Sequence, residues 1–203
     1  MDYRPYSDDA ANQLYALLFC DQPEFSVNLG KVWPALFAPA PDEAALRAIA
    51  QDAAIEARVR ALAYGRLRQL GKSVPSKLLL GAVIEVPLDA GLDVLAVYAE
   101  GGIRYINASG KISIFEGDNH PVVNEGRALL AAGQHVVNQI GPWDKPRLAP
   151  PAPGNVRMSF IVSDGLYFGE GVFETLERDQ LGGPVLQAAT KLLVAVVNLN
   201  APR

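Results

Sequence analysis

The chain has 203 residues, of which 50% are apolar and 20% charged, and it carries a formal net charge of −4. This length predicts one large domain, or one domain with an appendage, and the composition is that of a soluble globular protein. The acidic balance disfavours a nucleic-acid-binding protein, although it leaves room for a local basic patch. The single cysteine, Cys20, excludes an internal disulfide framework, a CxxC redox pair and a cysteine-rich zinc site.

The sequence also disfavours a membrane protein, because no run approaches the roughly 20 apolar residues that span a bilayer. The segment "LYALLFC" ends at Cys20 as a lipoprotein signal would. However, three aspartates and only one arginine precede it, and Phe19 stands where the cleavage site needs a small residue. We therefore expect a cytoplasmic protein without a membrane anchor.

Residues 1–75 predict a helical region that packs on the rest of the chain. Apolar residues at helical spacing indicate a helix over 8–20, with Ser7 or Asp8 as its cap. Residues 42–70 contain no proline, and their apolar residues recur at spacings of three and four. This pattern predicts helix over the segment, with a break near Asp52.

The end of that segment, "GRLRQLGKS" over 65–73, resembles a phosphate-binding loop at first sight. Such a loop has four residues between its glycines and connects a strand to the helix that follows. Here five residues separate Gly65 from Gly71, and the segment ends a helix, where the carbonyl groups repel an anion. We interpret Gly71 as the helix stop and exclude a nucleotide site here.

Residues 76–203 predict an α+β domain. Segments rich in β-branched and aromatic residues alternate with short turns, and short turns connect antiparallel strands. The expected strands lie at 78–88, 93–99, 103–107, 111–116, 156–163 and 166–176. The expected helices lie at 121–140, with Asp118 or Asn119 as its cap, and at 184–199.

Together these elements predict an antiparallel sheet of about six strands with two long helices on one face. The units 78–140 and 155–200 are joined by the proline-rich segment 141–154, which we expect to be an extended surface connection. Both helices contain small residues, including Gly126 and Gly133, at positions where glycine costs about 1 kcal/mol relative to alanine. Close packing against the sheet would offset that cost.

The two units also align with each other when the sequence is shifted by 63 positions. Leu95 and Val97 then match Met158 and Phe160, and Pro121 matches Pro184. Only six of 44 positions are identical, so the agreement lies in the order of strands, turns and helix starts. Two related strand–strand–helix units, or two unrelated ones of similar length, both stay open.

The chain is poor in the residues of common catalytic sites. Its two histidines, His120 and His135, have no histidine or cysteine neighbour at metal-ligand spacing, so the sequence predicts neither a metal site nor a cofactor. His120 precedes a helix start, where a loop or capping role competes with general-base chemistry. An enzyme would have to assemble dispersed residues, for which the candidates are His120, Asp118, Arg104 and Glu170.

Two segments are better suited to binding. Residues 47–77 hold seven basic side chains against two acids, and they include Arg58, Arg66 and Arg68. We expect either a solvated helix face or a surface that docks onto an acidic partner or onto the chain's own acidic C-terminal unit. The hairpin "RYINASGK" over 104–111 places further donors and an aromatic ring around a tight turn, namely Arg104, Tyr105, Asn107 and Lys111.

The sequence therefore favours a non-catalytic binding or interaction protein, of the adaptor or small-molecule sensor type. An enzyme, such as a hydrolase with a dispersed polar site around His120, is the alternative. We expect a protein partner or self-association, neither membrane nor nucleic acid, and a small-molecule ligand that the sequence does not identify.

Overall fold

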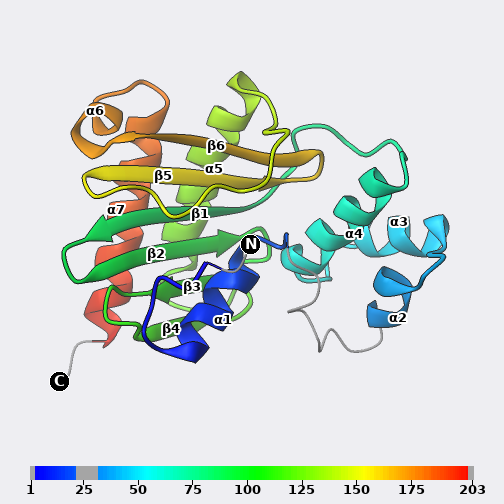
Figure 1. Ribbon diagram of the computed structural model, residues 1–203, viewed down its shortest axis with the longest axis horizontal. Coiled ribbons are helices and arrows are strands. Elements are labelled where there is room, and N and C mark those ends of the chain that lie inside the picture. Colours follow the sequence, from blue (N-terminus) through cyan, green and yellow to red (C-terminus); the bar gives the residue numbers. More distant parts are fainter. Residues whose placement is uncertain (1–2, 22–31, 201–203) are drawn as a thin grey trace.

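In the computed structural model, which describes residues 3–21 and 32–200, six strands form one antiparallel sheet with helices on both faces (Figure 1). The strand order is β4-β3-β2-β1-β5-β6, and every neighbouring pair is antiparallel. The predicted α+β fold with a six-stranded antiparallel sheet is thus confirmed. The strands are β1 (Leu79–Leu88), β2 (Gly91–Tyr98), β3 (Ile103–Ile106), β4 (Ile112–Phe115), β5 (Asn155–Val162) and β6 (Gly165–Val172).

In the described part of the chain before the sheet lie the helices α1 (Asp9–Leu18), α2 (Trp33–Phe37), α3 (Glu43–Gln51) and α4 (Ala57–Gln69). The Asp8 carboxylate caps α1 by accepting the amide of Ala11. The predicted break near Asp52 is confirmed, because this residue is extended and its carboxylate accepts the amide of Ala54. Gly71 follows α4 with a φ of 69°, as expected for a left-handed helix stop.

The helices beyond β4 differ from the sequence expectation in two places. They are α5 (Val123–Gln139), α6 (Phe173–Glu177) and α7 (Gly182–Asn200). Neither Asp118 nor Asn119 caps α5, since that helix begins after Val122 without a side-chain cap. The strand expected to reach Leu176 ends at Val172, because the chain turns there into α6.

The sheet has two differently covered faces. The α1 face includes Leu80, Val83, Val94, Tyr98 and Ile106 and packs against α1 and α4, and α3 in turn packs on α4. The opposite α7 face packs against α5 and α7, which lie behind the sheet in Figure 1. Its residues include Ala82, Ile84, Leu95, Val97 and Phe160. The strands β1, β2, β3 and β5 supply both cores, because successive side chains point to opposite faces.

Small residues allow α5 to lie close to the sheet. A Cβ atom built on Gly133 would lie 2.9 Å from Cε1 of Phe160, and one on Gly126 would lie 3.1 Å from Cδ1 of Ile103. Both distances are shorter than ordinary van der Waals contact. Close approach of helix and sheet therefore accounts for the two glycines inside α5.

The hairpins β2–β3 and β5–β6 lie on opposite sides of β1. Because β2 and β5 both run antiparallel to β1, they point in the same direction, while β3 and β6 lie outside them. The rotation that superimposes one hairpin on the other is a half-turn about the strand direction. This half-turn also exchanges the two faces of the sheet, so units related by it would have α5 and α7 on opposite faces. Because α5 and α7 pack on the same face, this rotation does not superimpose the two units. The 63-residue repeat stays a prediction from the sequence.

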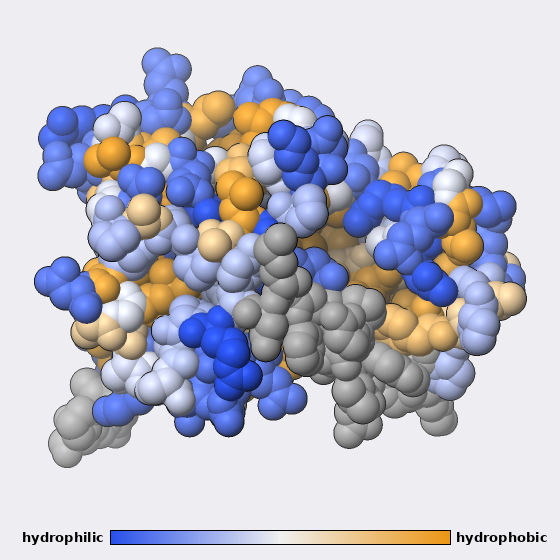
Figure 2. Space-filling model, in the orientation of Figure 1, coloured by the Kyte–Doolittle hydropathy of each residue, from blue (hydrophilic) through white to orange (hydrophobic). Residues whose placement is uncertain are grey.

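The helix α7 is the one described helix that is long and apolar enough, by length and composition, to cross a membrane. Its window Gly182–Leu199 has a mean hydropathy of 1.3, which corrects the expectation that no segment approaches a span. In the fold, Val185, Leu192 and Val196 are buried in the core of the α7 face. A core helix also has this composition, and the packing is consistent with a soluble protein. On the molecular face in Figure 2, apolar residues lie in small areas between polar ones.

Candidate functional site

A pocket of about 300 Å³ lies between the α7 face of the sheet and the helices α6 and α7. Three strands and both helices contribute to its wall, which is almost entirely apolar. The lining residues are Ile84, Val86, Leu88, Asp93, Leu95, Tyr105, Phe173, Leu186, Ala189, Thr190 and Leu193. Its volume is at the lower end of the roughly 300–1,000 Å³ range of small-molecule sites.

The alternation of the strands and the periodicity of α7 explain why these side chains meet. Residues 84, 86 and 88 of β1, and 93 and 95 of β2, are spaced by two and share one face. On α7, residues 186, 189, 190 and 193 are spaced by three and four, so they share one side of the helix. The small side chain of Ala189 leaves space between helix and sheet. The Thr190 hydroxyl donates to the carbonyl of Leu186, 2.9 Å away, and so is already bonded to its own helix.

Asp93 and Tyr105 form the polar part of the wall. The Tyr105 hydroxyl donates to Oδ2 of Asp93 over 2.9 Å, and the amide of Ala108 donates to Oδ1 over 2.6 Å. Among the described residues, no lysine or arginine nitrogen lies within 4.0 Å of this carboxylate. Burial raises the pKa of Tyr105, and its hydrogen bond to Asp93 raises it further. The phenol therefore stays protonated at neutral pH and is the donor in the hydrogen bond to Asp93.

The hairpin over 104–111 places its predicted binding residues differently from the sequence expectation. Arg104 and Tyr105 are both buried, on opposite faces of β3, so neither projects from the tip. Asn107 organises the turn, because its Oδ1 accepts the amides of Ser109 and Lys111. Lys111 is exposed. The tip is an ordered turn, and Tyr105 lines the pocket beside α7.

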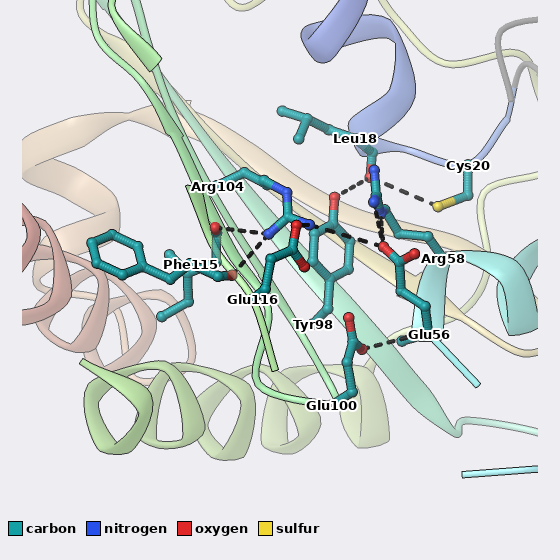
Figure 3. Close-up of polar contacts among 11 residues, drawn as sticks. Leu18, Cys20, Glu56, Arg58, Tyr98, Glu100, Arg104, Phe115 and Glu116 are labelled. Carbon is teal, nitrogen blue, oxygen red and sulfur yellow. Dashed lines mark hydrogen bonds and ion pairs between the residues drawn. The ribbon is translucent and has the colours of Figure 1, made fainter. Parts of the chain in front are cut away.

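Arg104 belongs instead to a polar cluster that joins α1 and α4 to the sheet (Figure 3). Its Nη1 donates to the carbonyls of Ile103 and Phe115, at 3.0 and 2.9 Å, and its Nη2 lies 2.8 Å from Oε1 of Glu116. Only 2% of the Arg104 side chain is exposed. With its donors turned to its own chain, this guanidinium stabilises the fold.

The rest of this cluster also makes internal contacts. The Tyr98 hydroxyl donates to the carbonyl of Leu18 over 2.9 Å, and Glu100 accepts the first amide of α4, from Ala57, over 3.0 Å. Arg58 forms an ion pair with Glu56 and lies over the Tyr98 ring, 5.5 Å from its centroid. Burial raises the pKa of the nearby Cys20 thiol, which keeps it protonated and unreactive.

A second group of buried charges crosses the same face of the sheet at β1, β5 and β6. Glu85 is fully buried and accepts the Tyr15 hydroxyl over 2.7 Å. Arg157 lies between two carboxylates, with Nη2 2.6 Å from Oε2 of Glu170 and Nη1 3.7 Å from Oε2 of Glu85. From the proline-rich segment, Arg147 inserts over the Phe19 ring, 3.9 Å from its centroid, and so anchors the segment that was expected only to connect the two units.

Each of the four residues of the enzyme alternative has a partner outside the group. His120 donates from Nε2 to the carbonyl of Gly101 over 2.8 Å, and Asp118 lies 3.7 Å from Nη2 of Arg127. Arg104, on β3, is bonded to Glu116, whereas Glu170, on β6, is bonded to Arg157. The strands β3 and β6 are four strand spacings apart in the sheet, or about 19 Å.

The basic residues of α4 also contact their own chain. Arg66 donates to Gln69 and to the carbonyl of Ala38, and Arg68 donates to the carbonyl of Ser163. The contact of Arg68 with Ser163 joins this helix to the C-terminal unit of the same chain, through a carbonyl group. Binding of an acidic partner through Arg58, Arg66 and Arg68 stays a prediction.

Within residues 3–21 and 32–200, no three His, Cys, Asp or Glu side chains lie together in a way that could hold a metal ion. Comparisons with known proteins give no match: no family model, no curated protein and no solved structure matches the chain. The site must therefore be interpreted from its own geometry.

Sequence reasoning did not find Asp93, although a signal for it is present in "LDVLAVY". Asp93, Leu95 and Val97 are spaced by two along the strand and so share one face, which places a carboxylate on the apolar face of β2. A charged residue on such a face needs a partner or a solvated space. That pattern could have indicated a pocket.

Proposed function

We propose that this protein is a non-catalytic binding protein of the small-molecule sensor type, acting in the cytoplasm. The observation that carries the proposal is the pocket beside α7, with its apolar wall and its single carboxylate–phenol pair. Ligand sites commonly combine an apolar surface with a few polar groups that fix orientation. The pocket has this character, whereas the other buried polar groups described above are bonded mainly to their own chain.

The dispersed enzyme site receives no support from the geometry. A general base must lie within hydrogen-bonding reach of the proton that it removes, together with the groups that orient the substrate. His120 lies in the loop between β4 and α5, whereas Glu170 lies on β6, and each already has an internal partner. A protein partner and self-association stay predictions, for which the exposed α7 residues Val194 and Val197 are the first to test.

The proposed pocket can be tested with a series of linear alcohols of increasing length, using isothermal titration calorimetry. Each buried methylene contributes about 0.8 kcal/mol, so affinity should rise about fourfold per carbon until the pocket is full and then level off. Ala189→Phe should abolish this binding, because the ring would occupy the space that Ala189 leaves.

The matched control is Val194→Phe, which adds the same ring to the exposed side of the same helix. It should bind the alcohols as the unchanged protein does. If no alcohol binds, or if both variants bind equally well, the pocket is not a ligand site.

A further inference from the structure

The polar groups of the pocket differ in what they can still offer a ligand. A carboxylate has about four acceptor positions, and hydrogen bonds from Tyr105 and Ala108 use two on Asp93. The Tyr105 hydroxyl gives its hydrogen to Asp93 and keeps its oxygen lone pairs. The Thr190 hydroxyl gives its hydrogen to Leu186. The lining side chains therefore offer acceptors and no remaining donor hydrogen.

A ligand that complements this wall must bring the donors itself. An alkylammonium group carries three donors and no acceptor, a hydroxyl group carries one donor, and a carboxylate carries none. Charge favours the same choice, because Asp93 has no lysine or arginine partner among the residues that the structure describes. A negative ligand group would meet the Asp93 charge in surroundings of low polarity, where repulsion is weakly screened.

We infer that the pocket binds a small hydrocarbon or aromatic primary amine, with its ammonium group on Asp93 and its apolar body against Ala189 and Leu193. This inference rests on the proposed function and adds the chemical class of the ligand. The small volume limits the amine to a compact one, and the wall contributed by Leu186, Leu193 and Phe173 selects an apolar body over a polar one.

The test compares three linear ligands of one chain length, a primary amine, an alcohol and a carboxylate, by calorimetry on the full chain at neutral pH. The amine should bind about tenfold more tightly than the alcohol, because its positive charge adds Coulomb attraction to the Asp93 carboxylate in surroundings of low polarity. The carboxylate should not bind measurably. This comparison needs no variant, so it does not depend on any substitution being tolerated.

Asp93→Asn then isolates the charge. The asparagine keeps an acceptor oxygen, so the alcohol should still bind, while the tenfold preference for the amine disappears. Asp89→Asn is the control, because it removes the same charge from the exposed turn beside Leu88. That variant should keep the preference.

The outcomes separate this inference from the proposed function. If alcohol and amine bind equally well, or the carboxylate binds most tightly, the ammonium assignment is wrong and the pocket remains a ligand site. If the preference for the amine persists in Asp93→Asn, the assignment is also wrong. If none of the three binds, both the inference and the proposed function fail.

Discussion

The two faces of the sheet differ in how their polar groups are bonded. On the α1 face, Glu85, Arg104 and Arg157 are buried, and each has a partner contributed by another segment. On the α7 face, the core is apolar, and the pair Asp93–Tyr105 borders an open pocket. The buried charges lie where the N-terminal helices attach, and the free acceptors lie where the chain leaves space.

Under the proposed function, this difference makes a buried charge a poor guide to the functional site of this protein. Burial is costly for a charge unless it is paired, so the paired charges of the α1 face report how the layers are joined. A half-buried carboxylate that lacks a cationic partner beside a cavity points instead to something that binds. Four substitutions test this contrast between the faces.

The largest effect should come from Arg157→Met on the α1 face. This change leaves Glu85 fully buried without the Arg157 cation, and breaking a buried pair in this way costs about 3–5 kcal/mol. Urea denaturation should show that loss in the free energy of unfolding. Adding Glu85→Gln removes the stranded charge and should restore about half of it. A loss below about 1 kcal/mol would mean that this pair does not join the layers.

Gly133→Ala tests how closely α5 lies against the α7 face. The new methyl would lie 2.9 Å from the Phe160 ring, so overpacking of about 1–3 kcal/mol should exceed the gain in helix propensity of about 1 kcal/mol. Thermal or urea denaturation should show a net loss of stability. An increase in stability would show that helix and sheet can separate without cost.

Gly65→Ala in α4 is the matched change on the other side of the molecule. There the nearest atom to the new Cβ is Nη2 of Arg68, at 3.7 Å, which is an ordinary contact. The substitution should therefore stabilise the chain by about 0.5–1 kcal/mol, through helix propensity alone. The same denaturation experiment measures it, and a loss of stability would indicate that α4 is more tightly packed than its contacts show.

The smallest effect concerns the pH dependence of stability. Burial raises the pKa of Glu85 above its ordinary value of 4.5, against the opposing influence of the Tyr15 hydrogen bond and of Arg157 and Arg147. The folded chain then holds this proton more tightly than the unfolded chain. The contribution of Glu85 to stability should therefore fall as pH rises from 4.5 through the raised pKa.

Glu85→Gln should remove this contribution while keeping an acceptor for Tyr15. Urea denaturation at a series of pH values should give curves for the two proteins that diverge across that window. Parallel curves would show that Glu85 titrates alike in the folded and unfolded chains, and that its burial costs nothing.

The local parts of this fold were accessible from the sequence. The break at Asp52, the helix stop at Gly71 and the antiparallel hairpins all depend on residues close together in the chain. Two local expectations failed at element ends, where the Asp118 cap is not used and α6 replaces the end of a strand. Propensity is weakest there, because a single turn can follow either course.

The candidate site was accessible only in part. The sequence predicted Tyr105 as a binding residue at the hairpin tip, whereas it lies in the wall of the pocket. Successive residues of β3 point to opposite faces, so Arg104 and Tyr105 lie on different sides of the sheet. The partners of Glu85 come from α1 and β5, far away in sequence, and no periodicity predicts such pairs. The pocket depends on how α7 lies against β1–β3, which is a property of packing.

The central position of β1 has a consequence for the chain as it leaves the ribosome. Ile84 pairs with Leu95 in the adjacent hairpin but also with Met158, 74 residues further on. At about 5–20 residues per second, synthesis leaves that side of β1 without its neighbour for roughly 4–15 s. During this interval β1, which is a central strand in the finished sheet, is an unpaired edge strand to which another chain could pair.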